Sequence, residues 1–296
     1  MAMVDDVMFG RGAFLRLAGL GIAGAVLPSL GAGGKALKPL MVRKEVVEAG
    51  AERPFSVLHV SDSHLARIDS RDGDGLYAFA KSRSRIGREL GEYYLDEAVH
   101  HARGKKLKLI HTGDFMDFMS GANLEYAERR FCTDDFLACV GNHEYWIDAV
   151  HRETEGYKAQ TVPRLKKSWQ GIPASAHRIN GINFFAFDDS FGTVTQEIAA
   201  AFEQTVKEGL PIVMVCHVPL WAESCGLKAS VCGMPGLRQN DELSCSFVER
   251  ARKEPLVKAV LAGHVHAFRK FRFSSAATEL VAGALFSGEC TEILFT

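Results

Sequence analysis

Residues 107–114 read Leu-Lys-Leu-Ile-His-Thr-Gly-Asp, a short apolar run that ends in a glycine and a carboxylate. The run predicts a strand covered on both faces, because buried strands of parallel sheets read as nearly continuous apolar runs. Asp114 then lies at the carboxyl end of this strand, where open α/β sheets usually bind their ligands. A carboxylate has two oxygens and can bridge two cations about 3.5–4 Å apart. We therefore interpret Asp114 as a bridging metal ligand.

Four further apolar runs have polar residues directly after the predicted strand. These runs cover residues 55–60, 136–140, 212–216 and 257–262. The polar residues that follow them are Asp62 and His64, Asn142 and His143, His217, and His264 and His266. Residues two positions apart in an extended chain face the same side, so each pair with this spacing can address one ion or two adjacent ions.

The recurrence of these residues carries more weight than any single motif. A packed core gives no reason for polar side chains to follow strand after strand at the same end, whereas a shared metal site does. Each motif alone would be explained equally well by an ordinary polar loop. The predicted ligands are oxygens and imidazole nitrogens without a thiolate, a set that suits two divalent ions of manganese, iron or zinc rather than a structural zinc site.

The order Asp-x-His, Gly-Asp, Gly-Asn-His-Glu, His and Gly-His-x-His resembles that of the calcineurin-like metallophosphoesterase superfamily, over residues 62–266. The resemblance implies an α/β fold, a four-layer α/β/β/α sandwich of two mixed sheets flanked by helices. It also implies a dinuclear metal centre at the strand ends. The first metal sphere would comprise Asp62, His64, Asp114 and His266, and the second Asp114, Asn142, His217 and His264.

A metal-dependent phosphoesterase follows from the resemblance and from the chemistry of paired cations. Two cations would clamp the phosphate of a small ester and lower the pKa of a bridging water towards neutrality. The resulting hydroxide would attack phosphorus in line with the leaving oxygen, which His143 could protonate as the catalytic residue. Phosphomonoesters and phosphodiesters both remain open as substrates.

The sequence departs from the protein serine/threonine phosphatase branch of that superfamily. In that branch, arginines follow the Gly-Asp motif and precede Gly-Asn-His-Glu, where they contact phosphate in a bidentate manner. Phe118 and Val140 occupy those places here, which disfavours a protein phosphatase. Two alternatives remain, a non-catalytic binding scaffold of the same fold and hydrolysis of a non-phosphate substrate. The complete ligand set favours the enzyme over the scaffold.

The composition is that of a globular protein and does not suggest a general binder of polyanions. The 296 residues carry 35 basic and 36 acidic side chains, for a net charge of −1. This balance offers no basic face of the kind that nucleic-acid binding needs. We expect one metallophosphoesterase domain over residues 54–296, preceded by a tether over residues 35–53.

Residues 1–34 have the composition of an export signal. Their apolar stretch, residues 17–27, is shorter than the roughly 20 residues that a membrane span needs, so no stable span is expected. Residues 11–16 resemble a twin-arginine motif in which Gly12 replaces the second arginine. We expect export to the periplasm or cell envelope. The alternatives are an N-terminal helix packed on the domain or an uncleaved anchor, and a cytoplasmic location.

Two other segments lie near the predicted site in the sequence. Residues 77–103 have a helical pattern, and basic residues that include Arg83 could meet a phosphate, although a solvated helix face is the favoured interpretation. Residues 222–245 form a long irregular run, and loops of this length are usually functional or disordered. A lid over the site, held by Cys225 and Cys232, is one interpretation of this run. Asp188 and Asp189 are interpreted as turn and cap residues.

Overall fold

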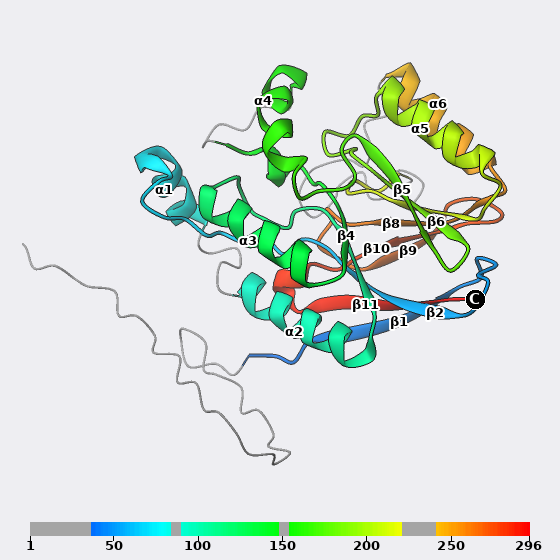
Figure 1. Ribbon diagram of the computed structural model, residues 1–296, viewed down its shortest axis with the longest axis horizontal. Coiled ribbons are helices and arrows are strands. Elements are labelled where there is room, and N and C mark those ends of the chain that lie inside the picture. The colour runs from blue at the N-terminus through cyan, green and yellow to red at the C-terminus, as the bar shows by residue number, and fades with distance from the viewer. Residues whose placement is uncertain (1–36, 84–89, 148–153, 221–240) are drawn as a thin grey trace, which may run out of the picture. The chain divides into compact units, whose positions relative to one another are not determined.

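The computed structural model describes residues 37–83, 90–147, 154–220 and 241–296, which Figure 1 shows as a coloured ribbon. Pro39–Thr296 form one compact unit. The predicted export signal and the predicted lid around Cys225 and Cys232 lie outside the described residues. Within the described part of the chain, the helices are too short or too polar to cross a membrane.

Five strands form the first sheet, in the order β1-β11-β2-β3-β4. Their bounds are Met41–Val47 (β1), Glu289–Phe295 (β11), Phe55–Val60 (β2), Lys108–Thr112 (β3) and Phe136–Cys139 (β4). Strands β2, β3 and β4 are parallel, with Val60 opposite His111 and Thr112 opposite Cys139. Because the strands are in register at their carboxyl ends, the loops that follow them leave the sheet at one edge.

Six strands form the second sheet, in the order β5-β6-β7-β8-β10-β9. Their bounds are Ala174–Ile179 (β5), Ile182–Phe187 (β6), Ile212–Val215 (β7), Val257–Ala262 (β8), Thr278–Val281 (β10) and Arg269–Arg272 (β9). The four central strands are parallel, and the edge strands β5 and β9 are antiparallel to their neighbours. Strands β7 and β8 are adjacent, so the loops after them also leave at one edge.

An apolar layer lies between the two sheets and includes Ile110 and Leu137 of the first sheet and Phe184 of the second. Strand β6 shows how the sequence produces this layer, because Phe184 faces the first sheet whereas its neighbour Phe185 faces the helices on the other side. Side chains alternate across a strand, so a strand such as β6, which is apolar at every position except Asn183, must be covered on both faces.

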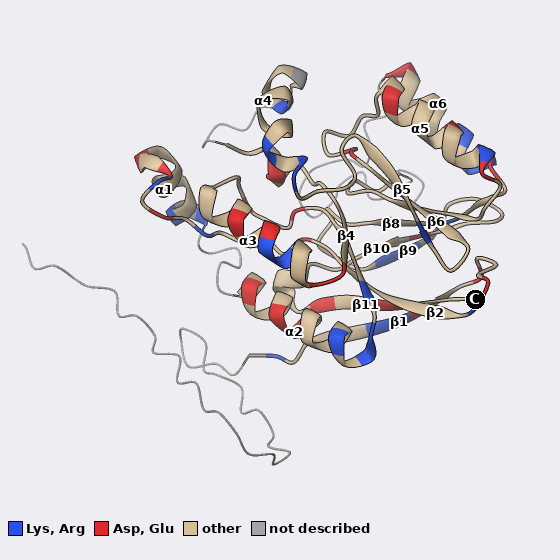
Figure 2. Ribbon diagram, viewed as in Figure 1, with Lys and Arg blue, Asp and Glu red and all other residues tan. Residues whose placement is uncertain are grey.

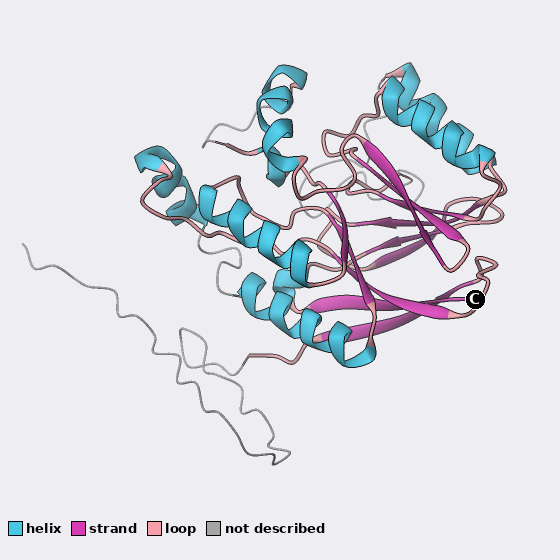
Figure 3. Cartoon of the chain, in the orientation of Figure 1, coloured by secondary structure: helices cyan, strands magenta, loops and turns pink. Residues whose placement is uncertain are grey.

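Helices cover the outer face of each sheet (Figure 3). Helices α2 (Leu90–Lys105) and α3 (Gly121–Thr133) pack on the first sheet, and α5 (Gln196–Lys207) and α6 (Glu242–Lys253) pack on the second. The layers therefore follow the order α/β/β/α, which confirms the predicted fold. Two further helices are α1 (Gly73–Arg83) and α4 (Glu155–Leu165).

The helix ends follow the usual capping and charge preferences. Ser120, Thr195 and Asp241 precede α3, α5 and α6, and each accepts a hydrogen bond from a backbone N–H of the first turn. Helix α2 has Glu92 in its first turn and basic residues in its last, which complements the helix dipole (Figure 2). These local signals position the helices that enclose the sheets.

Part of the predicted tether over residues 35–53 is wrong, because Met41–Val47 form strand β1. This strand pairs in parallel with β11, from Met41 opposite Glu289 to Val47 opposite Phe295. It is an edge strand with alternating exposed positions, so it lacks the apolar run that marks a buried strand. The folded unit therefore begins at Pro39 rather than near residue 54.

The helical pattern predicted over residues 77–103 corresponds to two helices, α1 and α2, with residues 84–89 outside the described part. Helix α1 is anchored by a small apolar cluster that includes its own Phe79 and Ala80 together with Phe118 and Trp146. Because Phe118 and Trp146 follow β3 and β4, this cluster fixes the end of α1 close to the loops after those strands.

Candidate metal centre

The structure brings all the predicted ligands together at the carboxyl ends of five strands. Asp62 and His64 follow β2, Asp114 follows β3, Asn142 follows β4, His217 follows β7, and His264 and His266 follow β8. Backbone hydrogen bonds tie neighbouring loops to each other, from Asp62 N to Gly113 O at 3.0 Å and from Gly263 N to His217 O at 2.9 Å. The first sheet supplies four of the ligands and the second sheet supplies three.

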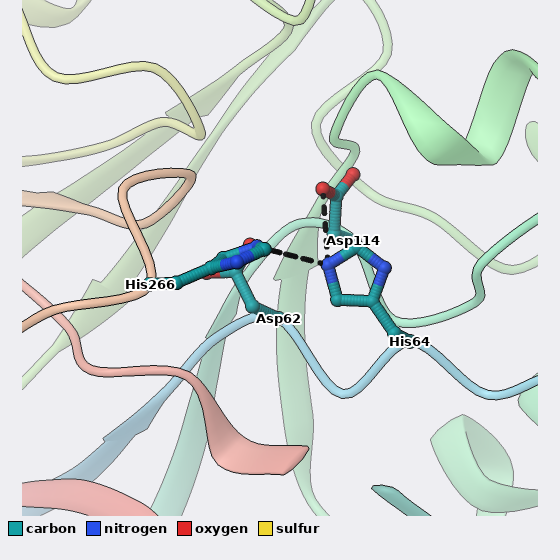
Figure 4. Close-up of side chains that lie close together, drawn as sticks. All are labelled: Asp62, His64, Asp114 and His266. Carbon is teal, nitrogen blue, oxygen red and sulfur yellow. Dashed lines mark hydrogen bonds and ion pairs between the residues drawn. The ribbon is translucent and has the colours of Figure 1, made fainter. Parts of the chain in front are cut away.

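The first group of side chains comprises Asp62, His64, Asp114 and His266, whose ligand atoms lie within 4.8 Å of one another. Figure 4 shows their polar ends converging on one point. His64 Nε2 lies 3.1 Å from His266 Nε2 and 3.6 Å from Asp114 Oδ2. His266 Nε2 lies 3.2 Å from Asp62 Oδ1. These four residues are the set that the resemblance implied for the first metal.

The second group comprises Asp114, His217 and His264, with Asn142 beside them. His217 Nε2 lies 3.3 Å from Asp114 Oδ2, 3.2 Å from His264 Nδ1 and 3.2 Å from Asn142 Oδ1. The same oxygen of Asp114 therefore faces His64 on one side and His217 on the other. This arrangement is what a carboxylate bridge between two cations requires.

Each of the two aspartates has one oxygen fixed by a backbone N–H and the other directed into the cluster. His264 N donates to Asp62 Oδ2, and His143 N donates to Asp114 Oδ1, both at 3.0 Å. Asp62 Oδ1 is buried and faces the ring nitrogens of His266 and His64, at 3.2 and 3.7 Å. When those nitrogens carry no proton, the oxygen lacks a hydrogen-bond donor among the described residues, which is costly unless a cation or a water molecule is present to satisfy it.

The imidazole tautomers are set by partners outside the cluster. His217 Nδ1 lies 2.7 Å from the carbonyl oxygen of Thr112, and His64 Nδ1 lies 2.9 Å from Asp117 Oδ1. Both partners only accept hydrogen bonds, so both Nδ1 atoms donate, which leaves Nε2 to face the cluster. Protein metal sites use such outer partners to orient their histidine ligands. The donor atoms present therefore fit divalent metal ions.

Five of the candidate ligands have left-handed backbone conformations, which are uncommon outside glycine. The φ angles are 56° at Asp62, 47° at His64, 54° at Asp114, 69° at His264 and 58° at His266. Such a conformation costs about 1 kcal/mol or more at each residue and persists where the surroundings impose it. The concentration of this strain at the strand ends is typical of a functional site.

Two histidines of the cluster, His64 and His217, favour the positively charged form, whereas burial lowers the pKa of His264 to about 3. Burial alone would raise the pKa of Asp62, but the charge of His266 and further hydrogen bonds from histidines hold it well below its usual range. Burial alone would lower the pKa of His217, but the charge of Asp114 raises it to about 10. The pKa of His64 is also about 10, because its bonds to Asp117 and Asp62 overcome burial. A metal ion would supply the same positive charge in place of these protons.

Metal affinity is therefore expected to rise with pH. Without metal, His64 and His217 hold protons at neutral pH, because their pKa values of about 10 lie above it. A cation that binds to their Nε2 atoms must displace these protons, so the dissociation constant should fall about tenfold per pH unit for each proton released. Titration calorimetry with Mn²⁺ in buffers of different ionisation enthalpy would count the protons. An affinity that is independent of pH would contradict this assignment.

Two acidic residues that the sequence did not assign to the site hold its loops in place. Glu144 accepts hydrogen bonds from the backbone N–H groups of Asp114, Met116 and Gly141 at 2.9, 3.0 and 2.6 Å. Its burial raises the pKa of its carboxyl to about 7. Asp189 accepts hydrogen bonds from the N–H groups that begin the loop after β7, at 2.9 Å from His217 N. Asp189 is therefore a capping residue, as expected, and the loop that it caps carries the candidate ligand His217.

His143 lies at the edge of the cluster, with Nε2 3.9 Å from Asp114 Oδ2. Its Nδ1 donates to the backbone carbonyl of Asp117 at 2.9 Å, and Asp117 Oδ1 lies 3.1 Å from the same nitrogen. Its ring packs on Trp146, with 3.6 Å between the ring centroids. The role of Asp117 was missed in the sequence, where its place three residues after Asp114 was the only signal.

Access to the cluster is through its histidines. The side chains of His266 and His143 are 23% and 10% exposed, whereas those of Asp62, His64 and His217 are at most 2% exposed. Within the described part of the chain, the cluster is therefore more exposed at His266 and His143 than at its aspartates.

The comparisons with known proteins agree with this architecture. Residues 55–268 match the family model described as calcineurin-like phosphoesterase. A dimetal phosphatase from Danio rerio superposes with a TM-score of 0.50 and 12% identity, over 79% of this chain and 88% of that chain. A putative 5′-nucleotidase from Staphylococcus aureus superposes with a TM-score of 0.45 and 15% identity, over 79% of this chain and 49% of that chain. Comparison with curated protein sequences gives no match.

Proposed function

The chain belongs to the calcineurin-like phosphoesterase family, and from this we propose that it hydrolyses small phosphomonoesters or phosphodiesters at a dinuclear metal centre. The observation that carries the proposal is the position of Asp114 Oδ2, which lies 3.6 Å from His64 Nε2 and 3.3 Å from His217 Nε2. One oxygen thus belongs to both groups of ligands. A binding scaffold would have no need to keep both groups complete around a shared carboxylate.

The proposed metal ligands are those that converge in the structure. Asp62, His64, Asp114 and His266 would hold one ion, and Asp114, Asn142, His217 and His264 would hold the other. Two divalent ions at these positions would neutralise the phosphate and make a coordinated water acidic enough to act as the nucleophile near neutral pH. Manganese, iron and zinc are all compatible with the oxygen and imidazole donors.

The protein itself supplies orientation and a proton. His143 donates its Nδ1 proton to the carbonyl of Asp117, so Nε2 is the atom that can carry a second proton towards the leaving oxygen. The N–H groups of His264 and His143 each donate to the aspartate oxygen that faces away from the cluster, and so orient the oxygen that faces it. Fixing the reacting groups in this way lowers the entropic cost of reaching the transition state.

A protein phosphatase is not proposed. Phe118 and Val140, which stand where that branch has phosphate-binding arginines, are fully buried apolar side chains here. Neither side chain can contact a phosphate. The proposal is therefore limited to small phosphate esters, for which the two metal ions and His143 suffice.

The proposed function is tested by loading the full chain with Mn²⁺ and assaying p-nitrophenyl phosphate and bis-p-nitrophenyl phosphate. We expect hydrolysis of at least one ester, which is lost on chelation and restored by added metal. The preferred ester would decide between monoesterase and diesterase activity. Tight metal binding without hydrolysis of either ester, or of a panel of nucleotides, phospholipids and sugar phosphates, would favour the binding scaffold.

A further inference from the structure

Arg83, the last residue of helix α1, forms a bidentate ion pair with Asp117 beside the candidate metal centre. Its Nε lies 2.8 Å from Asp117 Oδ2, and its Nη2 lies 2.6 Å from Asp117 Oδ1. The Asp117 side chain is 2% exposed and that of Arg83 is 20% exposed. A bidentate pair of this kind fixes the plane of the carboxylate as well as its position. The apolar cluster that includes Phe79 and Trp146 anchors α1 so that Arg83 reaches this point.

Asp117 in turn contacts two histidines of the site. Its Oδ1 lies 2.9 Å from His64 Nδ1 and 3.1 Å from His143 Nδ1. The guanidinium of Arg83 also lies over the ring of Trp146, at 5.2 Å from the centroid, and Trp146 packs on His143. Arg83 therefore contacts two of the groups that hold the ring of His143, the Asp117 carboxylate and Trp146.

The same three residues, His64, Asp117 and His143, are close enough to hold a third cation. The contacts of Arg83 argue against an ion there, because its guanidinium already engages both oxygens of Asp117. The positive charge that a cation would supply to Asp117 is thus already provided by a side chain. The arrangement is a chain of positioning contacts rather than another metal site.

We propose that Arg83 is a positioning residue that acts through Asp117 to orient His143 for protonation of the leaving oxygen. This inference rests on the proposed function. His64 would also be held by a metal ion through Nε2, so it would keep its place if Arg83 were removed. The His143 ring would have no metal bond, and among the described residues it is held by Asp117, Trp146 and the edge of the His64 ring. A shift of about 1 Å in a catalytic group can cost about a hundredfold in rate.

The experiment compares esters that differ in their need for protonation. The variant Arg83→Met is assayed on p-nitrophenyl and phenyl esters, as monoesters or diesters according to what the wild type hydrolyses. The p-nitrophenolate ion leaves readily without a proton, whereas phenolate needs one. We expect kcat for the phenyl ester to fall about 30-fold and kcat for the p-nitrophenyl ester to change less than about threefold, with KM and metal content unchanged.

Three further variants sharpen the test. His143→Gln should show the same selective loss, and its combination with Arg83→Met should cause little further loss, because both remove one function. Arg83→Lys keeps the charge but not the bidentate geometry, and should recover part of the rate with the phenyl ester. Arg71→Met is the matched control, since Arg71 pairs with Asp69 and Glu125 away from the site and should leave both rates unchanged.

Several results would overturn the inference. An equal loss with both esters and a raised KM would make Arg83 a phosphate-binding residue. Loss of metal from Arg83→Met would make it a support for the ligands, and unchanged rates would make it a structural ion pair. Thermal unfolding of each variant would show whether a loss of rate comes from misfolding. If Arg83→Met is misfolded, the two rates of Arg83→Lys test the inference instead. Inactivity of the wild type would refute the proposed function itself.

Discussion

Replacing Asp114 with asparagine is expected to lower kcat/KM by on the order of 10³-fold and to remove metal from both positions. The reason is that Asp114 Oδ2 lies 3.6 Å from His64 Nε2 and 3.3 Å from His217 Nε2, so it faces both groups of candidate ligands. The variant keeps the shape of the side chain but removes its charge, so an amide would have to serve both ions. Metal analysis of the purified variant and steady-state kinetics on the ester that the wild type prefers would measure the two effects.

A matched control is Asp135→Asn. Asp135 lies directly before strand β4 in the same sheet, but its side chain is 73% exposed and pairs with Lys108 on the surface. Exposed ion pairs contribute little to stability, so this variant should retain its metal and its rate. If Asp114→Asn kept two metal ions and near wild-type activity, the shared-carboxylate arrangement would be refuted. The remaining ligands would then have to be assigned anew.

Replacing Gly141 with alanine is expected to destabilise the protein by about 3 kcal/mol and to abolish metal binding. A Cβ at this position would lie 2.2 Å from Asp114 Oδ1 and 2.5 Å from Asp114 N. The second of these atoms belongs to the backbone and is held by Glu144 at 2.9 Å, so it cannot move aside cheaply. Denaturant unfolding with and without metal would give the loss of stability and the loss of binding.

The control for this prediction is Gly104→Ala in helix α2. A Cβ at Gly104 would meet nothing within 4 Å. Alanine is favoured over glycine inside a helix by up to about 1 kcal/mol, so this variant should be neutral or slightly more stable. A Gly141→Ala variant that unfolds at the same denaturant concentration as the wild type would show that the loops after β3 and β4 do not pack as closely as described.

The strands that carry the ligands could be predicted because each is a short run of apolar residues. Strand β3 is buried at Leu109 and Ile110, on opposite faces, so its sequence alone marks it as covered on both sides. The ligands follow such strands directly, so their positions could be inferred without any knowledge of how the strands pair. The convergence of Asp62 and His266, which are 204 positions apart, then followed from a shared sheet edge.

The supporting residues could not be predicted in the same way, because contacts between distant segments define their roles. Arg83 and Asp117 are 34 positions apart, and only the docking of helix α1 on Phe118 and Trp146 brings them together. The favoured interpretation of Arg83 as part of a solvated helix face is therefore wrong. Strand β1 was missed for a related reason, because its pairing partner β11 lies at the other end of the chain.

The division of the ligands between two sheets has a mechanical consequence. The sheets share no hydrogen-bonded strand among the described residues, so the packing between them and a few hydrogen bonds between their loops, such as that from His264 N to Asp62 Oδ2, set how far one can slide over the other. His64 and His266 stand on opposite sides of that boundary, at 3.1 Å. A cation bound by both residues would hold the two sheets together. Its affinity would therefore depend on how well the apolar layer between the sheets packs. Truncation of Leu137 or Phe184 in that layer to alanine is therefore expected to weaken metal binding without changing a ligand.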